Sequence, residues 1–318
     1  MFLVNLPIGI LALGLAAVFL PNDHNERKRR KLDVVELILL SPGLVLFLHA
    51  SDHIGEPTGF GMLVSAAVLL AMFFWTARRK GDRALIDLRL FKAKVFSACA
   101  VTQFLSNGVM FSGQMLIPIY LIRGCGRTPA EMGWLLAPLG LGMMCTYPTM
   151  GTLTKRFGIR WVSAAGALLA LVGTLPLYFL ANHSLYLGVL VPALFIRGAG
   201  LSAIGLPSIA AAYASVRRQD LPMATTSLNI VQRLGGPTMT TLCATFLGWA
   251  LRSEHVHHGT PTPYAQAFLL LCILHAVSLA ASLRLPLQLS GSEPSLGKAG
   301  AEGRQNGLTL ETKLFKKL

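Results

Sequence analysis

Long apolar runs alternate with short polar clusters along the chain. A helix needs about 20 predominantly apolar residues to cross the hydrocarbon core of a membrane, and nine runs approach or exceed that length. Gly and Pro interrupt several of them, which membrane helices tolerate better than soluble ones. The pattern therefore predicts an all-α, polytopic membrane protein with spans at 2–20, 33–50, 58–77, 95–122, 129–150, 161–181, 185–209, 222–250 and 265–286.

Basic residues gather in alternate loops between these runs. Arg and Lys cluster at 27–31, 78–94, 155–160 and 217–218 and recur in the C-terminal tail, whereas the opposite loops hold Arg123, Arg127 and Arg252. Because positive residues are retained in the cytoplasm, the clustered side and the C-terminus are expected to lie inside. Nine spans then place Met1 outside, an awkward start that suggests a missing N-terminal part.

Composition supports a membrane protein over soluble classes. Hydrophobic residues make up 53% and charged residues 13% of the 318 residues, and mean hydropathy is +0.58, whereas soluble domains carry about 25% charged residues. The net charge of +14 comes from clusters between apolar runs, so nucleic-acid binding is not indicated. We find no zinc-protease motif, nucleophile elbow, P-loop or paired cysteines. The sequence therefore predicts a protein that is not an enzyme and has no cofactor and no bound metal.

Five stretches, taken in order and spacing, resemble the 14-span drug:proton antiporter branch of the major facilitator superfamily. They are FLVNLPIG at 2–9, IDLRLF at 86–91, GTLTKRFGIR at 151–160, RGAG at 197–200 and NIVQRLGG at 229–236. The third stretch resembles a cytoplasmic loop motif of the superfamily, carried here by Gly151, Arg156, Gly158 and Arg160. Lys155 stands where that motif has Asp, which puts the family's charge network in doubt for this half.

The resemblance implies a domain organisation. The family has a six-span N-domain, a two-span linker and a six-span C-domain, so this chain would match spans six to fourteen and lack five N-terminal spans. Residues 1–20 would be the last helix of a truncated N-domain and 33–77 the two-helix linker. Residues 95–286 would form the six-helix C-domain, and 287–318 a disordered cytoplasmic tail.

Polar residues inside predicted spans are functional candidates because a bilayer makes them costly. At 100° per residue, one stripe on the span 95–122 carries Gln103, Asn107, Met110 and Gln114. These amides could join helices by hydrogen bonds, or they could line a cavity that offers donors and acceptors to a substrate. The residues alone leave both interpretations open.

Two arginines lie near the predicted midplane. Arg233 is about 16 Å into the span 222–250, and Arg197 about 18 Å into the span 185–209. Each costs at least ~2.5 kcal/mol there, so neither should face lipid. They must meet water, backbone carbonyls or acids from elsewhere. Arg233 shares one side of its helix with Asn229 and Gln232, and all four residues are candidates for a substrate pathway.

A proton-accepting group is not evident in the predicted spans. Proton coupling needs a carboxylate or His within the transport path, and Glu131 lies at the outer end of its span. The family scheme would therefore put this group in the missing N-domain. Glycines at 140, 142, 198, 200, 235 and 236 are interpreted as close-packing sites between helices.

The resemblance, rather than composition, implies the activity. It implies a proton-driven exporter of small amphipathic or cationic compounds, multi-pass in the bacterial inner membrane. The implied partners are the lipid bilayer, these substrates, protons and the missing N-terminal half. An importer of small solutes with the same fold stays open, as does a non-transporting half-protein or interaction remnant.

Overall fold

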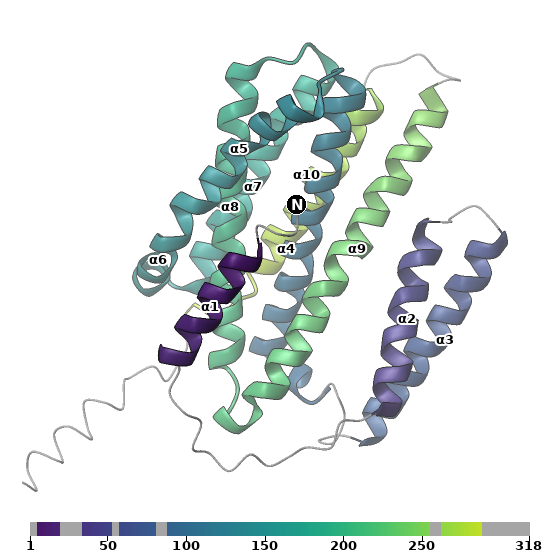
Figure 1. Cartoon of the computed structure of the whole chain (residues 1–318), viewed down its shortest axis with the longest axis vertical. Helices are drawn as coiled ribbons and strands as arrows, with labels where there is room; N and C mark the ends of the chain where they lie inside the picture. Colours follow the sequence, from purple (N-terminus) through teal and green to yellow (C-terminus); the bar gives the residue numbers. More distant parts are fainter. Residues whose placement is uncertain (1–4, 20–33, 53–56, 81–87, 255–261, 288–318) are drawn as a thin grey trace, which may run out of the picture. The chain divides into compact units, whose positions relative to one another are not determined.

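A computed structural model describes residues 5–19, 34–52, 57–80, 88–254 and 262–287 (Figure 1). Throughout these ranges the regular structure is helical, and no strand occurs among them. The chain divides into two units, Met1–Asp33 and Val34–Leu318, and each is described by itself. The predicted tail lies, from residue 288 onward, outside the described residues.

The first unit contains a single described helix, α1 (Asn5–Phe19). Its sequence is almost entirely apolar, yet Leu6, Ile10, Leu11 and Leu13 are exposed. A helix that is hydrophobic all round is stable only when lipid or other helices cover it. α1 therefore has the character of a membrane segment.

The second unit begins with the helical hairpin α2 (Val34–Asp52) and α3 (Pro57–Lys80). The two helices lie side by side (Figure 1). Leu40 and Phe73 are buried between them, and Gly43 of α2 lies against Leu69 and Leu70 of α3. This hairpin occupies the range predicted as a two-helix linker, and its role as a linker remains a prediction.

Six helices of 18 to 34 residues form a bundle in the rest of the unit. They are α4 (Lys94–Ile119, extended by a π-turn at Tyr120–Gly124), α5 (Pro129–Thr146), α7 (Ile159–Asn182), α8 (Leu187–Ala214), α9 (Leu221–Glu254) and α10 (Pro263–Ser282). The run predicted as one span at 129–150 is divided: Pro148 lies in a 3₁₀ turn (Tyr147–Thr149) that leads into the short α6 (Met150–Phe157). Further 3₁₀ turns, Leu90–Lys92 and Arg218–Asp220, precede α4 and α9.

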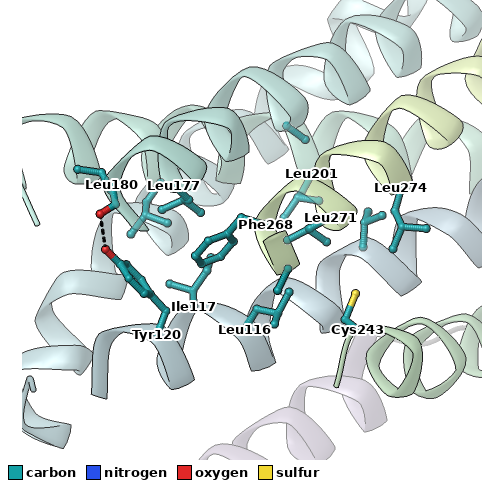
Figure 2. Close-up of a cluster of buried hydrophobic side chains, with 14 of the residues drawn as sticks. Leu116, Ile117, Tyr120, Leu177, Leu180, Leu201, Cys243, Phe268, Leu271 and Leu274 are labelled. Carbon is teal, nitrogen blue, oxygen red and sulfur yellow. Dashed lines mark hydrogen bonds between the residues drawn. The ribbon is translucent and has the colours of Figure 1, made fainter. Parts of the chain in front are cut away.

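The bundle core is built from large apolar side chains of α4, α7, α8 and α10 (Figure 2). Leu116, Leu177 and Phe268 are almost completely buried in it. The Tyr120 hydroxyl, at the end of α4, donates a 2.9 Å hydrogen bond to the Leu180 carbonyl of α7. Lipid is as apolar as these side chains, so van der Waals packing rather than exclusion from water holds them together.

Glycines let the helices approach to backbone contact. A methyl group on Gly200 of α8 would overlap the backbone of α7 at Gly166 and Ala170, and one on Gly235 of α9 would overlap the Phe104 carbonyl of α4. The packing role inferred from the sequence is confirmed for Gly142, Gly198, Gly200, Gly235 and Gly236, whereas Gly140 faces open space.

Among the described residues, five helices are long and apolar enough to cross a membrane: Gly61–Lys80 of α3, Lys94–Gly124, α7, α8 and α10. α9 is longer, at 34 residues, but the polar residues around Asn229 and Arg233 lower its hydropathy. A polar helix is compatible with a membrane protein when its polar side faces water or protein. The nine-span topology remains a prediction.

Candidate functional site

A buried polar centre lies inside the bundle around Arg197 of α8. Its side chain is 1% exposed. One terminal nitrogen donates a 2.6 Å hydrogen bond to the Thr174 hydroxyl of α7, and the other donates a 3.1 Å bond to the Val109 carbonyl of α4. The guanidinium also rests on Gly113, where a methyl group would overlap it. Arg197 thus meets a backbone carbonyl, one of the environments expected from its depth, and cross-links three helices.

Unpaired nitrogen atoms occur at this centre. The Nε of Arg197 and both ring nitrogens of His275 are buried without a hydrogen-bond partner in the described part of the chain. His275 of α10 is fully buried and lies close enough to Arg197 for their charges to interact. A second ionisable side chain thus accompanies the arginine inside the bundle.

Sequence reasoning missed His275. In the described bundle the acidic side chains Glu131, Asp220 and Glu254 lie at helix ends or connections, whereas His275 lies well inside α10. It is the one imidazole or carboxyl group there that is distant from the ends. The available signal was a histidine near the middle of the apolar run 265–286, the kind of position that marks function in membranes.

The stripe predicted on α4 divides in the structure. Gln103 is buried, and its amide nitrogen donates to the Gly205 carbonyl at 2.6 Å and the Ser208 hydroxyl at 2.5 Å, both on α8. This geometry matches the helix-joining interpretation for that residue. Asn107 and Met110 are half-buried and Gln114 is exposed, so these positions remain cavity-lining candidates.

The polar residues of α9 lie on the outside of the bundle. Asn229 and Arg233 are exposed and Gln232 is half-buried. No acidic side chain in the described ranges pairs with Arg233, which lies 12 residues from the start of a helix of 34. α9 packs against α4, so exposed polar positions occur on two adjacent helices. Lipid is a poor environment for an unpaired arginine, and this face therefore needs water or another protein segment.

The loop motif at 151–160 joins α6 to α7. Gly158 adopts a positive φ of 83° and so permits the sharp change of direction that a larger residue would resist. Arg160 donates a 2.6 Å hydrogen bond from Nε to the Leu285 carbonyl just after α10. Gly151 and Arg156 are exposed. The motif thus fixes the end of α10 through Arg160.

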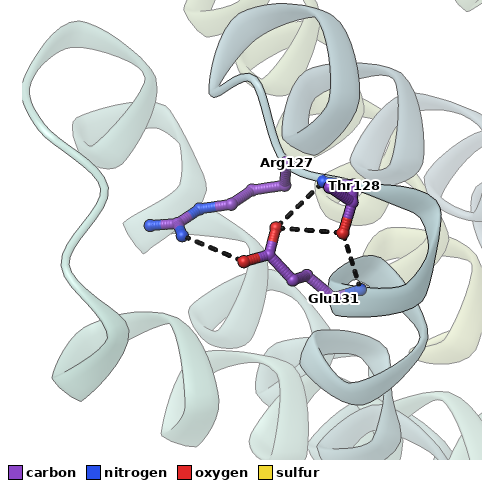
Figure 3. Close-up of polar contacts among 3 residues, drawn as sticks. All are labelled: Arg127, Thr128 and Glu131. Carbon is purple, nitrogen blue, oxygen red and sulfur yellow. Dashed lines mark hydrogen bonds and ion pairs between the residues drawn. The ribbon is translucent and has the colours of Figure 1, made fainter.

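A capping box closes the N-terminus of α5 (Figure 3). The Thr128 backbone amide donates to the Glu131 carboxylate at 2.9 Å, and the Glu131 amide donates to the Thr128 hydroxyl at 3.3 Å. Arg127 lies 3.6 Å from the same carboxylate. Glu131 is exposed and occupied by this cap, which gives it a structural function at the helix end.

A metal site is not formed by the described residues, among which His, Cys, Asp and Glu make no group of three. The five cysteines are free, and Cys99, Cys243 and Cys272 are buried. Apolar helices of spanning length, glycine-mediated contacts between them and polar groups held inside define a polytopic α-helical membrane protein.

Comparison with known proteins gives the family. A family model described as Major Facilitator Superfamily matches residues 1–237 and 99–316 in two overlapping stretches. The chain belongs to the major facilitator superfamily, whose members are transporters.

Individual relatives carry multidrug names. The chain is 28% identical over 267 residues to a multidrug resistance protein B homolog of Mycobacterium tuberculosis, covering 80% of this chain and 48% of that protein. It is 27% identical over 316 residues to the putative multidrug resistance protein MdtD of Yersinia enterocolitica, covering 95% and 65%. It is 29% identical over 174 residues to MdtD of Escherichia coli, covering 52% and 36%. The chain spans about half the length of the first of these relatives.

Proposed function

We propose that this chain forms the C-terminal part of a transporter that exports small amphipathic or cationic compounds across the inner membrane in exchange for protons. The observation that carries the proposal is the polar face of α4 and α9, where Gln114, Asn229 and Arg233 are exposed on membrane helices. Such a face suits a water-filled substrate path between two six-helix bundles that rock against each other. The multidrug names of the relatives favour export.

The proposed organisation follows from the family scheme. α1 would end the N-domain, α2 and α3 would link the domains, and the bundle from α4 to α10 would be the C-domain with its C-terminus in the cytoplasm. Coverage of 48% of the M. tuberculosis relative supports the assignment to one part of a longer transporter. The bundle would then supply one wall of the substrate path.

Proton coupling requires a group that accepts a proton within the membrane. In this bundle His275 is the candidate, because its ring is buried and both nitrogens are unpaired. The family scheme offers the N-domain as the other source. Replacement of His275 by Gln in a complete transporter distinguishes these two sources of the proton acceptor. If His275 is the acceptor, the variant should lose proton-driven export and retain substrate binding; if the acceptor lies in the N-domain, proton-driven export should persist.

A dye-export assay tests the proposed function. The 318-residue chain, and a reading frame extended upstream through any further apolar segments, are expressed separately in a pump-deficient bacterium. Ethidium accumulation is then measured with and without a protonophore. We expect the extended frame to lower accumulation only while the proton gradient persists, and the chain alone to leave it unchanged.

Arg233→Ala in the extended frame should reduce ethidium export at least several-fold. The matched control, Arg252→Ala, removes an exposed arginine from the far end of the same helix and should retain export. Proton-dependent export by the 318-residue chain alone would refute its assignment as a part. Equal export by the Arg233 variant and the unmodified transporter would refute the substrate path along α9.

A further inference from the structure

A pocket separate from the polar face opens between the start of α4 and the end of α10. Its volume is about 560 Å³. The 3₁₀ turn Leu90–Lys92, the first three turns of α4 and the last turns of α10 form its walls. None of the substrate-path candidates lines it.

Three cations and no acid line this pocket. They are Lys92, Lys94 and Arg284, all exposed. None of them forms an ion pair with another residue that the structure describes. Lys92 and Lys94 flank the N-terminus of α4, the positive end of the helix dipole, and the first turn carries no acidic residue. Positive charge there is unfavourable unless an anion compensates it.

The position of Arg284 is fixed by its neighbours. Its backbone amide donates to the Ala281 carbonyl at 3.0 Å, and the next carbonyl, of Leu285, accepts the 2.6 Å bond from Arg160. The end of α10 is thereby tied to the start of α7. The three cations consequently belong to a part of the fold that is held in place rather than to a free chain end.

Apart from Ser97, the remaining walls are apolar and extend along the helices away from the cations. On α4 they continue from Ala98 through Val101 to Leu105, and on α10 they run back from Ala281 to Val277. Lys94 and Leu105 are 11 positions apart, or about 16 Å of helix. Val101 and Val277 are 50% and 46% exposed, so this wall faces outward, where lipid chains would lie.

We propose that this pocket binds an anionic phospholipid, with the head-group phosphate between Lys92, Lys94 and Arg284 and one acyl chain along Val101, Leu105 and Val277. Basic pockets between membrane helices on the cytoplasmic side select acidic head groups in this way. A free phosphate would use the cations but leave the apolar wall uncovered, which favours the lipid. The proposal goes beyond the transport function and holds whatever compound is exported.

Native mass spectrometry tests the proposal directly. The full chain is released from detergent micelles containing phosphatidylglycerol or phosphatidylcholine with identical acyl chains, and retained lipid is counted. We expect one phosphatidylglycerol to be retained preferentially. Lys92→Gln, Lys94→Gln and Arg284→Gln should each weaken retention about five-fold, as one cation contributes at an anionic membrane surface, and the triple variant more than tenfold.

A matched control removes three exposed cations outside the pocket: Arg78→Gln, Lys155→Gln and Arg218→Gln combined. It should retain phosphatidylglycerol as the unmodified chain does. Ala280→Phe places a ring in the apolar part of the pocket from an exposed position; it should also lower retention while leaving the cations intact.

Three outcomes would overturn the lipid assignment. They are equal retention of both lipids, equal losses in the pocket and control variants, and displacement of the lipid by inorganic phosphate alone. Transport activity enters none of these measurements, so failure here and failure of the proposed export are distinguishable.

Discussion

Replacing Arg197 tests whether the buried arginine stabilises the bundle or is tolerated at a cost. Its two hydrogen bonds join α8 to α7 and α4. Polar contacts between membrane helices contribute about 0.6–1.7 kcal/mol each, so together they are worth about 1–3 kcal/mol. Burying the charge costs at least ~2.5 kcal/mol, and no acid in the described ranges pairs with it. The two terms nearly cancel.

The substitutions Arg197→Met and Arg197→Lys should therefore have different effects. Met keeps the length and removes both the bonds and the charge, so the free energy of unfolding should stay within about 1 kcal/mol of the original or rise. Lys keeps the charge, but its single ammonium cannot reproduce the two-pronged contact with the Thr174 hydroxyl and the Val109 carbonyl. It should lower the free energy of unfolding by about 1–2 kcal/mol.

Buried thiols provide the assay. Cys99, Cys243 and Cys272 are buried in the folded bundle, so a thiol-reactive fluorophore reports thermal unfolding in detergent. The Arg197→Met variant should unfold at or above the temperature of the unmodified chain, and the Arg197→Lys variant should unfold at the lowest temperature of the three. Arg252→Met, at an exposed site, should leave the temperature unchanged. If Arg197→Met unfolded below Arg197→Lys, the hydrogen bonds would outweigh the cost of the charge and the reasoning would be wrong.

Other substitutions test separate features. Gly200→Leu should disrupt the contact between α7 and α8 and lower the free energy of unfolding by more than about 2 kcal/mol, because the larger side chain overpacks the interface. Gly140→Leu, at an open position, is the control. The thiol-labelling assay compares the unfolding of the two variants. Thr128→Ala should cost about 1 kcal/mol by removing the cap of α5, measured by hydrogen exchange at the start of that helix, where unchanged protection would refute the cap's role. His275→Leu should leave the unfolding temperature unchanged or raise it, because the unpaired ring nitrogens have no bonds to lose; a large fall would indicate an unrecognised partner.

The sequence was most informative about where helices lie. The predicted span 161–181 corresponds to α7 (Ile159–Asn182), because an uninterrupted apolar run has one stable form in lipid. Ends were less accurate where proline was involved. α8 continues past Pro207 to Ala214, as membrane helices can, whereas Pro148 lies in the turn that follows the end of α5. Local sequence does not distinguish these cases.

The polar sites were predictable only in part. The depth of Arg197 follows from counting residues, but its acceptors, the Thr174 hydroxyl and the Val109 carbonyl, come from helices distant in sequence. Gln103 and Gln114 share a predicted stripe, yet one is buried against α8 and the other exposed. Helical periodicity shows which residues share one side of a helix. It does not show which neighbouring helix, if any, packs against that side.

The glycine contacts between α7 and α8 also bear on how the protein could move. Gly166, Gly173 and Gly200 bring the two backbones together without intervening side chains, so no layer of rotamers can absorb sliding between them. Two spin labels, one on the outer surface of each helix, should keep a constant separation through every stage of the proposed transport cycle. Any shape change must be accommodated elsewhere, and this pair offers a fixed reference frame against which other displacements can be measured.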